Sequence, residues 1–258
     1  MKRELQIFFN ALTFYTRLPA PSWVEHKDEF LRESPKYFPL IGWIVALIGI
    51  GALAAAWWTL SPAVAVLLSM AATIVATGAF HEDGFADACD GFGGGRNKQE
   101  VLEIMKDSRL GTYGVAGLVL LLGLKFLALW EIGTESFALL AGALWCGHTW
   151  SRFLAARLIQ THEYVHDTDR SKSEPITSYR MGRKAVTVGA LFAAISLTAL
   201  LHAPLFLLAL IPAYLAKRTA AAYFRARLGG YTGDCLGAVQ QIVEVVFYLG
   251  ILGLWRLL

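Results

Sequence analysis

Charged residues are scarce in this chain, and cysteine is rarer still. Asp, Glu, Lys and Arg together make up only 17% of the sequence, while hydrophobic residues make up 56%. Ordinary soluble domains contain about 25% charged residues, so the composition excludes a typical water-soluble fold. The three cysteines, Cys89, Cys146 and Cys235, form no CxxC pair, which argues against both a disulfide framework and a zinc site.

The chain also lacks internal repeats, low-complexity segments and an evident cleavable signal peptide. The apolar stretch over residues 5–18 is too interrupted for a signal sequence, because Gln6, Asn10, Thr13 and Arg17 fall within it. The helical spacing of its apolar residues instead predicts an amphipathic or re-entrant helix at the membrane surface.

Long apolar runs are what the chain does contain, and several approach the roughly 20 residues needed to cross a bilayer. We predict an all-α, polytopic integral membrane protein that forms a single domain over residues 1–258. About seven transmembrane helices are expected, over residues 40–60, 62–80, 113–130, 137–158, 185–201, 204–222 and 236–254.

Lys and Arg are distributed very unevenly between the predicted loops. Four of the connecting segments hold 21 of the 23 Lys and Arg residues: 1–37, 81–112, 152–184 and 217–235. The three turns on the opposite side contain none: 59–62, 131–136 and 202–203. Since short cytoplasmic loops are enriched in Lys and Arg, this asymmetry predicts a cytoplasmic N-terminus and places every polar loop on the cytoplasmic face.

One polar stretch, residues 81–91 with the sequence HEDGFADACDG, follows an apolar run directly. If the helix continues through it, Asp83, Asp87 and Asp90 are spaced i, i+4 and i+7 and share one face. Carboxylates this close repel one another unless a cation lies between them. Oxygen ligands favour Mg²⁺, Mn²⁺ or Ca²⁺, so we predict a divalent-cation site, with a solvated acidic helix end as the alternative.

The glycine-rich run 91–95 is expected to break that helix, and a short amphipathic helix capped by Asn97 is expected to follow it. This helix leads into a charged, glycine-bounded string: Lys106, Asp107, Ser108 and Arg109. Phosphoryl chemistry needs cations around the non-bridging oxygens, and a guanidinium suits phosphate well. We predict that the string binds phosphate; contact with lipid headgroups is the alternative for the other basic residues.

More distant polar residues are expected on the same membrane face. His81 is a candidate acid or base, and three others are candidates for substrate binding: Arg152, Thr232 and Asp234. Two ionisable residues, Lys125 and Glu244, fall within predicted spans, where such groups are candidates for a function; the alternatives are that each snorkels to the membrane surface or pairs inside the bundle.

Together these motifs resemble the cobalamin synthase family. The resemblance rests on residues 81–91 and on MKDSRLGTYG at 105–114, with support from FYTRLP at 14–19, FPLIG at 38–42 and TGD at 232–234. It implies a Mg²⁺-dependent transferase in the cytoplasmic (inner) membrane of a bacterium or archaeon. Such an enzyme joins adenosylcobinamide-GDP to α-ribazole, or to α-ribazole 5′-phosphate, and releases GMP.

The resemblance also implies roles for the motif residues. Asp83, Asp87 and Asp90 would hold Mg²⁺ against the diphosphate, and His81 or one aspartate would accept the proton of the attacking hydroxyl. Lys106 and Arg109 would bind phosphate oxygens and stabilise the charge that builds on the leaving GMP, and Asp107 and Ser108 between them are further candidates for substrate binding. The partners implied are the two small-molecule substrates and the bilayer, without nucleic acid; association into a homo-oligomer is left open.

Three other functions are compatible with parts of the pattern. A CDP-alcohol phosphotransferase of phospholipid synthesis shares the reaction type and has an aspartate motif with a different spacing. An ion-coupled transporter would use the aspartates as an ion site, although transport sites usually lie near the bilayer midplane. A structural membrane subunit would carry out no chemistry.

Overall fold

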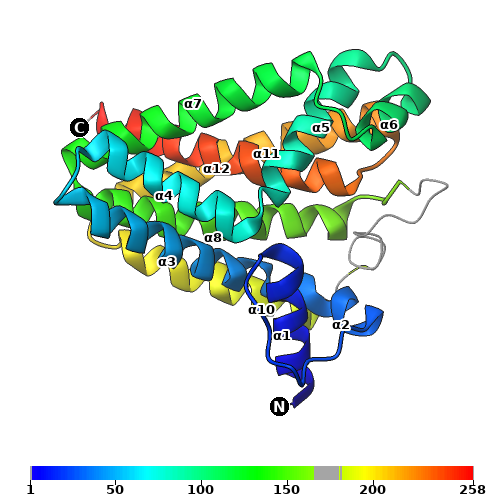
Figure 1. Ribbon diagram of the computed structural model, residues 1–258, viewed down its shortest axis with the longest axis horizontal. Helices are drawn as coiled ribbons and strands as arrows, with labels where there is room; N and C mark the ends of the chain where they lie inside the picture. Colours follow the sequence, from blue (N-terminus) through cyan, green and yellow to red (C-terminus); the bar gives the residue numbers. More distant parts are fainter. Residues whose placement is uncertain (1, 166–179, 181, 258) are drawn as a thin grey trace.

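The described part of the chain is almost entirely helical, and its long helices run side by side (Figure 1). The computed structural model describes residues 2–165, 180 and 182–257. Its α-helices are α1 (Lys2–Tyr15), α2 (Asp28–Glu33), α3 (Phe38–Trp57), α4 (Pro62–Thr77), α5 (Phe80–Gly94), α6 (Lys98–Lys106), α7 (Thr112–Glu135), α8 (Phe137–Thr161), α10 (Arg183–Ser196), α11 (Leu210–Leu228) and α12 (Gly233–Trp255). Short 3-10 helices cover Ser34–Tyr37, Leu197–Leu200 and Pro204–Ala209. Most of the predicted loop 159–184 lies outside the described residues.

The apolar helices confirm an all-α membrane protein. Five helical runs are long and apolar enough to cross a bilayer: Asp28–Trp57, Thr112–Glu135, Arg183–Leu200, Pro204–Leu228 and Gly233–Trp255. A sixth span results if α4 and α5 are taken together. Helix α8, expected as a span, falls outside this set because polar residues such as His148 and Arg152 lower its hydropathy; it packs against α3 and α12. The total of seven spans remains a prediction.

The acidic stretch is on a helix of its own, contrary to the expectation that the preceding helix runs straight into it. Helix α4 ends at Thr77, and the next two residues, Gly78 (φ 65°) and Ala79 (φ 58°), adopt the left-handed conformation. Helix α5 then starts at Phe80, bent by 89° from α4. The prediction that the three aspartates lie on one helix is confirmed. The left-handed corner sets the direction of that helix.

The glycine run behind the aspartates ends the helix, as predicted, near the last residue of the run. Helix α5 continues through Gly91 and ends at Gly94. Gly91 itself is packed: a Cβ there would lie 2.6 Å from Met105 Cγ, so a small residue lets α6 lie against α5. The predicted Asn97 cap is confirmed, since its side chain accepts a hydrogen bond from the Glu100 amide at 3.0 Å.

The polar segments gather at one end of the bundle. Figure 1 places α5 and α6 at the same end as α1 and α2, while the turns α3–α4 and α7–α8 lie at the opposite end with the C-terminus. An ion pair between Arg256 and Glu131, at 2.8 Å, ties the C-terminal residues to the far end of α7. Which of the two ends faces the cytoplasm remains a prediction from the charge distribution.

Candidate active site

The three aspartates of α5 differ strongly in their surroundings. Asp83 is exposed, Asp87 is partly buried, and Asp90 is buried. All three lie within one helix at the predicted spacing, and at about 100° per residue they share one side of it. The acidic face of α5, meaning these three residues, therefore runs from solvent into the protein.

A fourth carboxylate joins this face from the other end of the sequence. Gly84 lies against the first turn of α12, where a Cβ on it would be 3.1 Å from Asp234 Cα and 3.2 Å from the Asp234 carbonyl oxygen. Gly237, one turn into α12, completes the contact, because a Cβ there would be 3.3 Å from Gly84 Cα. Two backbones this close place the Asp234 side chain next to the aspartates of α5.

The charges of this group converge on Asp87. Asp87 is partly buried, and the carboxylates of Asp234, Asp83 and Asp90 lie close enough for their charges to act on it; no cationic described side chain is found to do so. Asp83 also acts on Asp234. Carboxylates this close repel one another, and either a bound proton or a cation from outside the chain can offset the repulsion.

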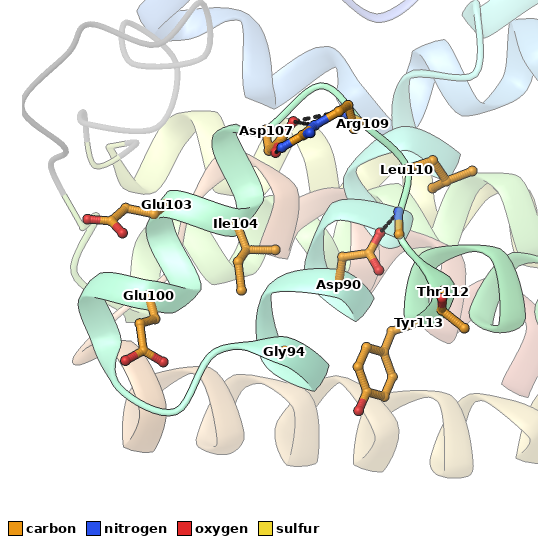
Figure 2. A pocket seen from close by; sticks show the side chains of 11 residues that line it. Asp90, Gly94, Glu100, Glu103, Ile104, Asp107, Arg109, Leu110, Thr112 and Tyr113 are labelled. Atoms are coloured by element: carbon orange, nitrogen blue, oxygen red, sulfur yellow. Dashed lines mark hydrogen bonds and ion pairs between the residues drawn. The ribbon is translucent and has the colours of Figure 1, made fainter.

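Asp90 has partners that the sequence did not suggest. Its two carboxylate oxygens accept hydrogen bonds from the backbone amides of Gly111 and Gly114, each at 2.8 Å. Figure 2 shows the side chain pointing from α5 toward the loop that leads into α7. Because the first amides of a helix have no intrahelical acceptor, Asp90 caps the start of α7 and ties it to α5.

The charged string before α7 lies beside the same carboxylate. Arg109 and Asp107 form an ion pair at 2.6 Å, and the hydrogen bonds from Arg109 lower the pKa of Asp107 to about 2. A cavity of about 700 Å³ brings these two residues together with Asp90 (Figure 2). Its lining further includes Gly94, Glu100, Glu103, Ile104, Leu110, Gly111, Thr112 and Tyr113.

Two residues of the charged string and two of the acidic face do not line this cavity. Lys106 and Ser108 are exposed on the neighbouring turn, and Asp83 and Asp87 lie further along α5. The structure thus brings Asp90, Asp107 and Arg109 into one cavity.

His81 and Arg152 lie in the interior instead. His81 is 2% exposed and stacks on Phe38, with ring centroids 5.5 Å apart. Arg152 is also 2% exposed; its guanidinium lies 5.8 Å from the centre of the Phe38 ring and donates to the His148 carbonyl at 3.0 Å. These two candidates therefore share a different environment from the acidic face.

That environment is a buried polar cluster centred on Glu244 of α12. Lys125 of α7 pairs with the Glu244 carboxylate at 2.5 Å, and His148 Nδ1 of α8 lies 3.1 Å from it. Gln240 and Tyr248 donate to the same carboxylate at 2.6 and 3.2 Å. The alternative of pairing inside the bundle is therefore what the structure shows for Lys125 and Glu244.

Thr232 has a local structural role. It is the N-cap of α12, and its hydroxyl accepts a hydrogen bond from the Cys235 amide at 3.3 Å. The adjacent Tyr231 pairs with residues 163–165 through backbone hydrogen bonds, which holds the loop before α12 against the end of α8. Thr232 thus helps to position Asp234 in the first turn of α12.

The chemistry of the acidic face fits a hard divalent cation. Its donors are carboxylate oxygens, and nothing cationic among the described side chains offsets their charge at Asp87. Within residues 2–165, 180 and 182–257, no three His, Cys, Asp or Glu side chains are positioned as a finished metal site. Metal binding on this face therefore requires side-chain rotation, which is least costly for the exposed Asp83 and the partly buried Asp87.

A helical membrane protein with an acidic helix face beside a basic loop can be a membrane transferase or a transporter. Comparison with known proteins decides between these two classes. The sequence model of the cobalamin-5-phosphate synthase family matches residues 7–252. The chain belongs to this family, whose members are transferases of cobalamin biosynthesis, and the transporter and the structural subunit are thereby set aside.

Curated relatives agree over almost the full length. The chain is 42% identical to the adenosylcobinamide-GDP ribazoletransferase of Shewanella amazonensis, over 98% of this chain and 97% of the relative. It is 43% identical to the enzyme of the same name from Leptothrix cholodnii, again over 98% and 97% of the two chains. No solved structure matches the chain.

Proposed function

We propose that this chain is a Mg²⁺-dependent adenosylcobinamide-GDP ribazoletransferase. In the proposed reaction a hydroxyl oxygen of α-ribazole, or of its 5′-phosphate, forms a new bond to the phosphorus next to the cobinamide. The bond between the two phosphates breaks, and GMP leaves. The names of the relatives support the substrates, and the acidic face beside a cationic loop is the structural observation that supports this chemistry.

In this proposal the acidic face holds the metal. Asp83, Asp87 and Asp90 supply the predicted ligands, and Asp234 adds a fourth carboxylate beside Asp87. Bound Mg²⁺ would neutralise the charge that develops on the diphosphate oxygens. The hydrogen bonds from Gly111 and Gly114 orient Asp90, and each of its oxygens keeps a lone pair for a further contact.

The basic loop would bind the nucleotide side of the substrate. The exposed Arg109 is held by Asp107, and a phosphate could replace that carboxylate because guanidinium binds both in the same two-pronged way. Lys106 at the end of α6 and Ser108 would add further phosphate contacts. The 700 Å³ cavity beside Asp90 is large enough for a nucleotide-sized group.

The position of His81 favours an aspartate as the proton acceptor. The His81 ring is buried among aromatic side chains and faces the interior cluster. A general base must come within hydrogen-bond reach of the hydroxyl that it deprotonates. Asp87 is partly exposed and lies on the acidic face, so it is better placed for this role.

The reaction would take place at the cytoplasmic surface. Among the described residues, the Lys- and Arg-rich segments 2–37, 81–112 and 217–235 lie at the end of the bundle that carries α5 and α6 (Figure 1). By the positive-inside rule this end faces the cytoplasm.

Release of GMP by the purified protein tests the proposal. In detergent with Mg²⁺, we expect GMP from adenosylcobinamide-GDP only when α-ribazole or its phosphate is also present. EDTA should stop the release, and Asp87→Asn should abolish it. Asp28→Asn, the same change on an exposed residue of α2, should leave the rate unchanged.

Two results would contradict different parts of the proposal. GMP release that resists both EDTA and Asp87→Asn would remove the metal assignment. A folded wild-type protein that releases no GMP with either acceptor would remove the substrate assignment.

A further inference from the structure

A second cavity lies on the opposite side of α5 from the acidic face. It has a volume of about 570 Å³ and runs between α5, α11 and α12. Its lining is almost wholly apolar: Phe85, Ala88, Cys89, Phe92, Ala216, Thr219, Ala220, Tyr223, Phe224, Ala238 and Ile242. Thr219 and Tyr223 are exposed, so this apolar groove opens at the outer surface of the bundle.

One arginine stands at the end of the apolar groove. The guanidinium of Arg227 lies 6.0 Å from the centre of the Phe92 ring and 5.8 Å from that of Tyr223, both of which line the groove. It donates one hydrogen bond to the Tyr223 hydroxyl at 3.0 Å and another to the Gly95 carbonyl at 2.7 Å. A guanidinium has five N–H groups, so donors remain for a ligand.

The charge of Arg227 is not neutralised within the described residues. Helix α11 carries four basic residues and no acidic one over its whole length, Leu210–Leu228. None of the ion pairs found among residues 2–165, 180 and 182–257 includes Arg227. An apolar groove with an unpaired cation at its end is complementary to a ligand with an apolar tail and an anionic head.

We propose that the apolar groove binds one acyl chain of an anionic phospholipid, whose phosphate contacts Arg227. Both α11 and α12 belong to runs that are long and apolar enough to cross a membrane, so the groove opens beside lipid. Basic residues at a membrane surface attract anionic lipid headgroups. A substrate is the weaker fit, because the body of α5 separates the groove from Asp87.

The bound acyl chain would pack against the side of α5 that faces away from the active site. Phe85 and Phe92 occupy the groove side of α5, while Asp87 and Asp90 lie on the other side of the same helix. An acyl chain between α5 and α11 fills space that would otherwise let α5 shift. This lipid site does not depend on the proposed reaction. It would give the membrane a direct role in holding α5 in place.

A single thiol reports on the occupancy of the groove. Cys89 lines it and is partly exposed, whereas Cys146 and Cys235 are fully buried. We expect phosphatidylglycerol added to the detergent-purified protein to slow alkylation of Cys89 by N-ethylmaleimide, followed by mass spectrometry. Protection should need about fivefold less phosphatidylglycerol than phosphatidylcholine, the preference expected from one basic contact.

Variants of Arg227 identify the headgroup contact. Arg227→Gln should remove the preference for phosphatidylglycerol, Arg227→Lys should keep it, and Arg256→Gln, at the other end of the molecule, should leave it unchanged. Equal protection of the wild-type protein by both lipids would overturn the proposal, as would a preference that survives in Arg227→Gln. Protection by α-ribazole phosphate in place of lipid would also overturn it and assign the groove to a substrate.

Discussion

Asp83 and Asp90 lie on the same helix but have very different surroundings. Asp83 is exposed, whereas Asp90 is buried and accepts hydrogen bonds from the Gly111 and Gly114 amides. The same residue type in one motif therefore serves both the metal proposed here and the fold. Substitutions at the two positions should separate these contributions.

Asp90→Asn should destabilise the protein by about 1–3 kcal/mol, because the new NH₂ group would face a backbone donor where a carboxylate oxygen had accepted. Asp83→Asn should change stability by no more than about 0.5 kcal/mol, as expected for an exposed site. Thermal unfolding in detergent measures both. Equal stability of the two variants would contradict the capping role of Asp90.

The effects of aspartate substitutions on metal binding should differ from their effects on stability. Asp83→Asn and Asp234→Asn should both weaken binding of Mn²⁺, followed by electron paramagnetic resonance without substrate, because each removes a carboxylate from the group around Asp87. Asp28→Asn is the matched control. Wild-type affinity in Asp234→Asn would exclude this residue from the metal site.

Glu244 is the residue on which the interior cluster depends. Replacing it by Gln leaves the buried Lys125 without its 2.5 Å partner. Loss of one member of a buried pair typically costs about 3–5 kcal/mol. Glu131→Gln, which breaks the exposed pair with Arg256, should cost less than about 1 kcal/mol. Chemical unfolding of both variants compares the two costs, and similar losses would argue that the Lys125–Glu244 pair is not buried.

At the scale of helices, close backbone contacts determine which elements meet. Gly42 brings α3 against α8, since a Cβ there would lie 2.5 Å from the His148 carbonyl oxygen. Gly84 does the same for α5 and α12. These contacts position His148 in the cluster and Asp234 at the acidic face, so small residues in the helices have consequences at the site.

Gly42→Ala should destabilise the protein by about 1–3 kcal/mol through overpacking. Gly51→Ala, in the same helix with nothing within 4 Å of the added Cβ, is the matched control. It should be neutral or stabilising by up to about 1 kcal/mol, since alanine favours a helix. Thermal unfolding distinguishes the two, and a neutral Gly42→Ala would show that α3 and α8 are further apart.

For the whole molecule, the charge distribution predicts an orientation that labelling can test. In a Cys89→Ala background, Ser108→Cys should react with a membrane-impermeant maleimide only in inverted vesicles. Thr59→Cys, in the turn between α3 and α4, should react only in intact cells. The opposite pattern would place the active site outside the cytoplasm.

The sequence by itself determined the class of the protein and its local chemistry. Scarce charge and long apolar runs indicated membrane helices, and the i, i+4, i+7 spacing correctly placed Asp83, Asp87 and Asp90 on one helix. The Asn97 cap was also readable, because a cap depends on residues three positions apart. Each of these properties depends on near neighbours in the chain.

Only the tertiary structure decided which distant groups meet. The 89° corner at Gly78 and Ala79, the approach of Asp234 to Asp87, and the capture of Asp90 by two amides were not predictable from spacing. Likewise, Lys125 and Glu244 were recognised as unusual, but not as partners. Such contacts depend on how helices pack, which is set by small surfaces like that of Gly84 and not by any local periodicity.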